Sequence, residues 1–370
     1  MSMAAKTGLV WHERYMWHIT GIAAGAMPAG GFIEPGLFHI EEPTSKRRIR
    51  NLLEVSGLLD ELALVRPRPA TEEEVLRIHT PGYVERLKAM SRQGHGDAGE
   101  RAPVGPDSWP IAQLSAGGCI AAADAIVNGE IRNAYALVRP PGHHAERDRG
   151  RGFCLLANTA IAIEHLRAVH GMKRIAVFDW DVHHGNGVQG LYFHDPDVLT
   201  MSVHEESNYP VNSGTLTETG EGAGRGGNIN VPLPPGSGHD TYLAVVERVV
   251  LPALEKFRPE MVFVASGFDS CLYDPLGRQM AMAETYRLMT RALKDAAERL
   301  CGGRLLMTHE GGYSDFYAPY CGLAVMEELS GIKTEVGDPF GFHIHKPTQR
   351  LQPHQVVVID MAAALVRNVP

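Results

Sequence analysis

Short apolar runs of strand-forming residues alternate with longer amphipathic stretches over most of this chain. Five runs have the length of a buried strand: AYALV (134–138), RIAVF (174–178), VLTMSV (198–203), MVFVAS (261–266) and RLLMT (304–308). Stretches with a helical spacing of apolar residues accompany them, at 111–128, 157–169, 239–257 and 283–300. This alternation is typical of βαβ units, in which helices cover both faces of a parallel sheet. The sequence therefore predicts the α/β fold class.

Further helices are expected outside these units. Thr71 and Glu74 stand at capping-box spacing, which predicts a helix start. Pro81 stands where the first turn of a helix tolerates proline, and QVVVIDMAAALV near the C-terminus predicts a last helix. The 370 residues contain no internal repeat or clear linker, so we expect one domain over residues 1–370.

Residues 19–43 are rich in Gly, Pro and Ala and show little periodicity. A loop of this length in a compact domain usually carries function or contacts a partner. We therefore expect the segment at the rim of a site or at a contact between subunits.

Composition excludes several classes of protein. The net charge of −8 argues against general binding to nucleic acid or anionic membranes. No apolar run approaches the ~18 residues needed to cross a bilayer, and the first residues do not have the pattern of a signal peptide. The five cysteines form no C-x-x-C pair, which disfavours a disulfide framework or zinc ribbon. We expect a cytoplasmic protein.

Polar side chains follow four of the predicted strands. The segments are RPPGHHA, DWDVHHGNG, GFDS and HEGGY. In open α/β sheets, ligands bind outside the carboxyl ends of the strands. We therefore expect one crevice to collect seven residues: His143, His144, Asp179, Asp181, His183, Asp269 and Tyr313.

Three of these residues form a candidate metal site. Asp181 and His183 stand two apart, so their side chains leave an extended segment on the same side. Asp269 can supply a third ligand from another strand. Three protein ligands and an open position are typical of catalytic zinc, and iron(II) is the competing ion because mixed oxygen and nitrogen ligation suits it too.

The adjacent histidines His143 and His144 are candidate acid–base groups. Each imidazole needs a partner to set its tautomer, and Asp179 and Asn186 can serve. Tyr313 can donate a hydrogen bond to a developing oxyanion. The alternative for the histidines is a structural pair. Cys154 is expected to pack in the core and not to act as a nucleophile. His204 and His309 lie at strand ends and are expected to contact the residues of the site from outside.

The motifs together resemble a known family. RPPGHHA, GFCLLAN, DWDVHHGNG, SGFDS…DPLG and HEGGY occur in the order and at about the spacing of the zinc-dependent histone deacetylases, from roughly residue 45 to 330. The nearest group is that of the bacterial histone deacetylase-like amidohydrolases, which resemble class II. The resemblance implies the arginase–deacetylase fold, a single α/β domain around an eight-stranded parallel sheet.

The resemblance also implies roles for individual residues. Asp181, His183 and Asp269 match the zinc ligands; His143 and His144 match the tandem catalytic histidines; Tyr313 matches the tyrosine that polarises the amide carbonyl. Asn186 stands where class I enzymes carry Asp and is what the class II-like group has.

The family's potassium sites and acyl-lysine channel can be placed in the same way. An inner K⁺ site would use oxygens of Asp179, Asp181, His183, Ser202 and Val203. A second K⁺ site would lie by Tyr192, Asp195 and Val198. The substrate channel would be lined by Gly152, Phe153, Tyr209, Leu276 and Gly311, with Asp107 as a candidate rim aspartate.

The implied function is hydrolysis of acetyl or related acyl groups from acyl-lysine-like amines by metal-activated water, in a homo-oligomer such as a dimer or tetramer. One alternative is an acetylpolyamine deacetylase. Glu205 and Glu206 would favour it by attracting a cation, and Leu276 disfavours it because the polyamine-selective enzyme has glutamate there. The others are an arginase-like two-metal ureohydrolase and a non-catalytic acyl-lysine or polyamine binding module.

Overall fold

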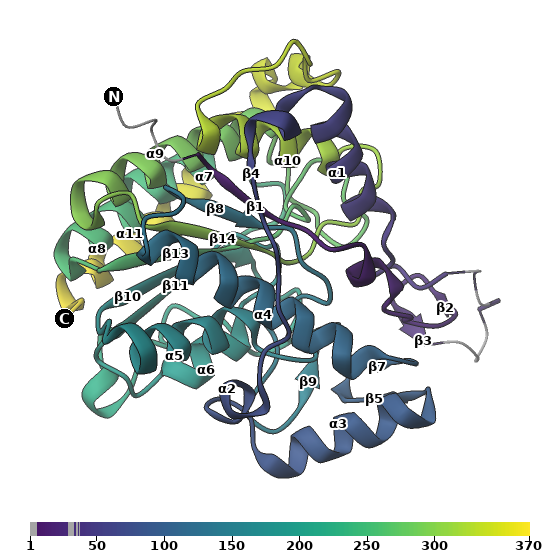
Figure 1. The fold of residues 1–370 in the computed structure, drawn as a ribbon. Coiled ribbons are helices and arrows are strands. Elements are labelled where there is room, and N and C mark those ends of the chain that lie inside the picture. The colour runs from purple at the N-terminus through teal and green to yellow at the C-terminus, as the bar shows by residue number, and fades with distance from the viewer. Residues whose placement is uncertain (1–5, 29–32, 35, 37) are drawn as a thin grey trace.

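The computed structural model describes residues 6–28, 33, 34, 36 and 38–370. An eight-stranded sheet forms its centre, and every neighbouring pair of strands in it is parallel (Figure 1). The strand order is β12-β11-β10-β13-β14-β8-β1-β4. The predicted fold class and the eight-stranded parallel sheet are therefore confirmed.

All five strands that the sequence predicts are present. They are β8 (Ala134–Ala136), β10 (Ile175–Asp179), β11 (Val198–Glu205), β13 (Met261–Ser266) and β14 (Leu305–His309). The sequence analysis missed three strands at the two edges of the sheet: β1 (Gly8–Val10), β4 (Ala63–Val65) and β12 (Asn228–Leu233). Two of these have three residues, too few for a periodic signal, and Pro232 interrupts the third, which an edge strand tolerates.

The strands bury both of their faces. On β10, Ala176 and Phe178 pack into one hydrophobic core, while Ile175 and Val177 pack into the other. Side chains alternate across a strand, so continuous apolar runs of this kind fit a sheet that is covered on both sides.

Helices cover the two faces (Figure 1). One layer consists of α2 (Glu72–Leu76), α3 (Pro81–Gln93), α4 (Ser108–Val127), α5 (Asn158–His170) and α6 (Asn186–Tyr192). The other consists of α1 (Thr44–Val55), α7 (His239–Val245), α8 (Leu251–Phe257), α9 (Ala283–Cys301), α10 (Ala318–Ser330) and α11 (Pro353–Leu365). A π-helical turn, η4 (Val246–Val250), joins α7 to α8.

The predicted helix starts are confirmed. Thr71 Oγ1 accepts from the Glu74 amide, and Glu74 Oε2 accepts from the Thr71 amide at 2.7 Å, which closes the capping box before α2. Pro81 occupies the first turn of α3. The sequence analysis did not predict α1, α6 or α10.

Helix α4 is long and apolar enough to cross a membrane by length and composition alone, but 72% of its most apolar window is buried inside the protein. Its near-uniform hydropathy therefore fits a core helix between the sheet and the other helices of its layer.

The segment 19–43 is not wholly irregular. It contains two short antiparallel strands, β2 (Ala23–Ala24) and β3 (Met27–Pro28). Part of the predicted loop, residues 29–32, 35 and 37, lies outside the described residues. Ala26 lines the channel described below, which places this part of the segment at the rim of the site.

A buried ion cluster ties this segment to the sheet. Arg139, which follows β8, donates through Nε to Glu41 Oε1 at 2.9 Å and through a terminal nitrogen to the His18 carbonyl at 2.7 Å. Lys46 Nζ lies 3.2 Å from the same Glu41 oxygen. Burial alone would raise the pKa of Glu41, but the charges of Arg139 and Lys46 outweigh it and hold the pKa below its ordinary value.

We predict that Glu41→Gln lowers the free energy of unfolding by about 3 kcal/mol at neutral pH, because it leaves Arg139 and Lys46 buried without their anion. Chemical denaturation measures this loss. Since the pKa of Glu41 is lower in the folded chain than in the unfolded chain, the difference between variant and wild type should shrink in acid, as pH falls below the ordinary carboxyl pKa. An equal stability of the two proteins at neutral pH would contradict the role of the cluster.

Candidate active site

The predicted metal ligands meet at the carboxyl ends of β10 and β13. His183 Nδ1 lies 3.0 Å from Asp181 Oδ1 and 3.1 Å from Asp269 Oδ2. Both carboxylates are fully buried. Burial and the charge of Asp181 raise the pKa of Asp269. Two buried carboxylates and one imidazole nitrogen are a donor set that fits a divalent ion such as zinc.

Backbone amides hold these ligands in place. The Gly311 amide donates to Asp181 Oδ2 at 2.9 Å, and the Val182 amide donates to Asp269 Oδ1 at 2.8 Å. A Cβ on Gly311 would lie 2.2 Å from Asp269 Oδ2. Gly311, which the sequence analysis expects in the channel wall, lies against the predicted metal ligands and is not among the residues that line the channel. Only glycine lets the backbone come this close to the carboxylates.

The two histidines have different partners. His143 Nδ1 lies 2.9 Å from Asp179 Oδ2, and His144 Nδ1 lies 2.7 Å from Asn186 Oδ1. Burial alone would lower the pKa of His143, but the carboxylates of Asp181 and Asp179 raise it well above its ordinary value. Burial, and then the charges of His143 and His183, lower the pKa of His144 well below its ordinary value.

A hydrogen-bond chain fixes the tautomer of His144. Asn186 Nδ2 donates to Glu146 Oε1 at 2.9 Å, and Arg151 binds the same carboxylate oxygen at 2.8 Å. Because the amide nitrogen is committed to Glu146, the amide oxygen must face His144, which therefore carries its proton on Nδ1. Its Nε2 is left as a base.

Two carboxylates that the sequence analysis did not single out position the catalytic loops. Glu310 Oε2 accepts from the Gly142 and His143 amides at 2.6 and 3.0 Å, and burial raises the pKa of Glu310 to about 7. Asp274 Oδ2 accepts from the Tyr313 amide at 2.7 Å. Both residues lie inside the quoted motifs, but hydrogen bonds to backbone amides leave no signal in residue spacing.

A narrow channel leads to these groups. Its volume is about 100 Å³, and its lining consists of Ala26, Arg101, His144, Gly152, Phe153, His183, Asn208, Tyr209, Leu276 and Tyr313. The structure thus brings four of the five predicted channel residues together with His144, His183 and Tyr313. A Cβ on Gly152 would lie 2.4 Å from His144 and 2.8 Å from Tyr209, so glycine is needed at this wall.

Tyr313 is partly buried at the inner end of the channel. Its ring lies 5.9 Å from the Phe153 ring, and Lys46 Nζ lies 5.1 Å from its centroid. Burial, and then the nearby carboxylates of Asp269 and Asp181, raise the pKa of Tyr313 well above its ordinary value. The phenol therefore keeps its proton and can donate it in a hydrogen bond.

Several other predicted residues lie around this centre. Cys154 accepts from the His144 amide through its sulfur at 3.4 Å and is buried, and burial raises the pKa of its thiol. This agrees with a packing role. His204 contacts Ser202, and His309 contacts Tyr135, so both are one layer removed from the channel.

The residues predicted to hold potassium also lie close together. Asp179 and Ser202 are register partners on β10 and β11, with Val203 next along the strand, and a small cavity borders Asp179 and Ser202. At the second predicted site, the Asp195 amide donates to the Tyr192 carbonyl at 3.0 Å, near the start of β11 at Val198. The Asp195 carboxylate binds Arg167 at 2.6 Å.

The expectation for Glu205 at the rim is wrong. Its carboxylate is fully buried and accepts from the Nε and the backbone amide of Arg278, each at 2.6 Å. Its charge is therefore balanced by the guanidinium of Arg278, which is itself largely exposed. Glu206 is exposed but does not line the channel. Asp107, the candidate rim aspartate, lies at the start of α4, where its carboxylate is 3.5 Å from Arg14, and it does not line the channel either.

Comparison with known proteins identifies the family. The model of the histone deacetylase domain matches residues 39–329. The chain belongs to the histone deacetylase family. It is 50% identical over 339 residues to a histone deacetylase-like amidohydrolase of Pseudomonas aeruginosa, covering 91% of this chain and 89% of that one. It is 36% identical to a probable deacetylase of Archaeoglobus fulgidus, covering 88% and 86%.

A solved structure has the same fold. The crystal structure of the HDA15 HD domain superimposes with a TM-score of 0.86 at 29% identity, covering 98% of this chain and 95% of that chain. The resemblance to histone deacetylases and to the bacterial amidohydrolases is thus confirmed, and membership of this family indicates an enzyme of the deacetylase and amidohydrolase class.

We predict that Asn186→Asp moves the acidic limb of the pH profile of kcat/KM for deacylation upward by about one pH unit. A carboxylate beside His144 Nδ1 favours the imidazolium and raises the pKa of His144, so the neutral base is present only at higher pH. The profile should be measured beside that of Asn186→Ser, which introduces no charge. An unchanged acidic limb in Asn186→Asp would contradict the assignment of His144 as the base.

Proposed function

We propose that this histone deacetylase-family chain is a zinc-dependent amidohydrolase that removes acetyl or related acyl groups from acyl-lysine-like amines. One observation carries the proposal: a channel of about 100 Å³, walled by Phe153 and Tyr209, ends at His144, His183 and Tyr313. The volume of this channel is well below the several hundred Å³ that pockets for drug-sized ligands have. A slender aliphatic stem with an amide at its tip matches such a space.

Asp181, His183 and Asp269 would hold the zinc ion. When bound, zinc supplies Lewis acidity toward the amide carbonyl and the attacking water. Tyr313 donates its hydroxyl proton in a hydrogen bond to the carbonyl oxygen, where negative charge develops. Phe153 and Tyr209 exclude bulk water from the stem of the substrate.

The histidines divide the proton transfers. His144 Nε2 takes a proton from the attacking water and delivers it to the leaving amine nitrogen. His143 is oriented by Asp179, whose Oδ2 lies 2.9 Å from its Nδ1, and donates a hydrogen bond toward the negative charge that develops beside it. The arginase-like alternative needs a second ion beside the first, but the adjacent carboxylates Asp179 and Glu310 accept hydrogen bonds from His143 and from the backbone instead.

Potassium is proposed as a structural ion at Asp179 and Ser202, with Val203 contributing its backbone. The small cavity beside these residues supports the proposal, as does the position of two oxygen donors on neighbouring strands. An ion there would balance the charge of Asp179, which also orients His143.

We predict that Tyr313→Phe lowers kcat for an acetyl-lysine peptide by about 10²–10³, because it removes one donor from the developing oxyanion. Zinc content should equal that of wild type, since Tyr313 is not a proposed ligand. Steady-state kinetics on zinc-loaded protein and metal analysis make the test. Full activity of Tyr313→Phe, or a zinc content below that of wild type, would contradict the role proposed for the Tyr313 hydroxyl.

The charge at the channel favours acyl-lysine peptides over acetylpolyamines. Among the described residues, Arg101 is the one permanently charged side chain in the lining. Its guanidinium carbon lies 5.9 Å from the Tyr209 ring centroid. The second ammonium of an acetylated diamine would meet this cation near the mouth, and Glu205 is already neutralised by Arg278.

We predict that Arg101→Glu raises kcat/KM for acetylputrescine relative to a neutral acetyl-lysine peptide by about tenfold, through replacement of a repulsive charge by an attractive one. Arg101→Gln is the matched control and should give an intermediate ratio. If wild type already prefers acetylputrescine, or if neither variant changes the ratio, the proposed substrate class is contradicted.

We also propose a homo-oligomer, a dimer or tetramer, that uses the segment 19–43. Several apolar side chains in it are more than half exposed: Ile19, Ile22, Met27, Ile33 and Phe38. Apolar exposure of this density is typical of a contact surface. Light scattering should show an oligomer for wild type and a smaller species for the double variant Ile22→Ser, Phe38→Ser; a monomeric wild type would contradict the proposal.

A further inference from the structure

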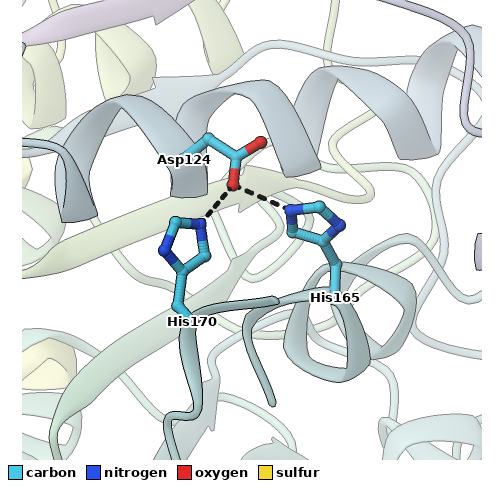
Figure 2. A group of neighbouring side chains, drawn as sticks. All are labelled: Asp124, His165 and His170. Carbon is cyan, nitrogen blue, oxygen red and sulfur yellow. Dashed lines mark hydrogen bonds and ion pairs between the residues drawn. The ribbon is translucent and has the colours of Figure 1, made fainter. Parts of the chain in front are cut away.

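A second group of metal-ligating side chains lies outside the catalytic site, on helices α4 and α5. Asp124 projects from α4, and His165 and His170 come from the last turns of α5 (Figure 2). Asp124 Oδ1 lies 2.8 Å from Nε2 of each histidine. Three ligand atoms thus converge on one point.

A further carboxylate faces the other nitrogen of His165. Its Nδ1 lies 3.1 Å from Glu74 Oε1. Glu74 is itself held by two hydrogen bonds from Arg68, at 2.6 and 2.8 Å, and by the Thr71 amide. Carboxylates that orient ligating histidines through the distal nitrogen are a regular feature of metal sites.

A metal ion accounts for the contacts of this cluster when His165 is a neutral imidazole. Both nitrogens of His165 face carboxylate oxygens, and neutral imidazole has one N–H to offer. If that hydrogen lies on Nδ1, toward Glu74, the lone pair of Nε2 points at Asp124 Oδ1. A metal ion bound by His165 Nε2 and Asp124 Oδ1 removes this repulsion.

The cluster reverses the composition of the catalytic ligand set, because one carboxylate oxygen of Asp124 faces two imidazoles. In the catalytic set, His183 Nδ1 lies 3.0 and 3.1 Å from two carboxylate oxygens. The second cluster is more open, because the side chains of Asp124 and His170 are 28% and 19% exposed while that of His165 is 7% exposed. Asp124 also lines a surface pocket of about 520 Å³, so an ion can reach it from solvent.

We propose that Asp124, His165 and His170 form a second metal site that binds a divalent transition-metal ion of the zinc class. Two imidazoles and one carboxylate are ligands that suit such an ion. The site joins α4 to the C-terminal turn of α5 and so has a structural role. The proposal does not rest on the deacylase function.

Zinc stoichiometry at micromolar free Zn²⁺ tests the site. We expect two equivalents per chain in wild type, one in His170→Gln, one in Asp181→Ala and none in the double variant. His354→Gln, which removes an exposed histidine at the start of α11, is the matched control and should bind two. His170→Gln should keep wild-type deacylation, which shows that it folds.

The bound ion can also be examined directly. In Asp181→Ala, X-ray absorption of the remaining zinc should show nitrogen and oxygen ligands that include imidazole. The same zinc content in His170→Gln as in His354→Gln would overturn the proposal, whereas a wild type that loses its single equivalent in His170→Gln but keeps it in Asp181→Ala would contradict the catalytic zinc site alone.

Discussion

Two buried carboxylates, Asp181 and Asp269, face one imidazole at the carboxyl ends of neighbouring strands, and the surrounding structure is organised around them. Carboxylates that are fully removed from water cost several kcal/mol each unless a cation and hydrogen bonds compensate. The amides of Gly311 and Val182 supply part of this compensation. The central strands β10 and β13 fix the two acids about one strand spacing apart, so the fold itself creates the place for a cation.

The layer around the ligands is equally constrained. Asp179 orients His143, while the chain from Arg151 through Glu146 to Asn186 sets the tautomer of His144. The two imidazoles are 3.9 Å apart between ring centroids, yet their pKa values are shifted in opposite directions. The carboxylates of Asp181 and Asp179 outweigh burial and raise the pKa of His143, whereas burial and the charges of His143 and His183 lower the pKa of His144. This difference is what lets adjacent histidines take different parts in one reaction.

The sequence could predict the central strands and the strand-end residues because apolar runs and the motifs that follow them are local signals. Glu310 and Asp274 could not be assigned, since they act by accepting hydrogen bonds from distant backbone amides. The partner of Glu205 could not be found either, because Arg278 lies 73 residues further along the chain. The strands β1 and β4 are too short to show a period.

The dependence of deacylation on metal tests the account most directly. Wild type and Asp181→Ala should be depleted of metal with a chelator, assayed on an acetyl-lysine peptide, and assayed again after addition of Zn²⁺. The account predicts that depleted wild type is inactive and recovers with Zn²⁺, whereas Asp181→Ala stays inactive at the same Zn²⁺ concentration. Full activity of metal-depleted wild type, or recovery of Asp181→Ala, would contradict it.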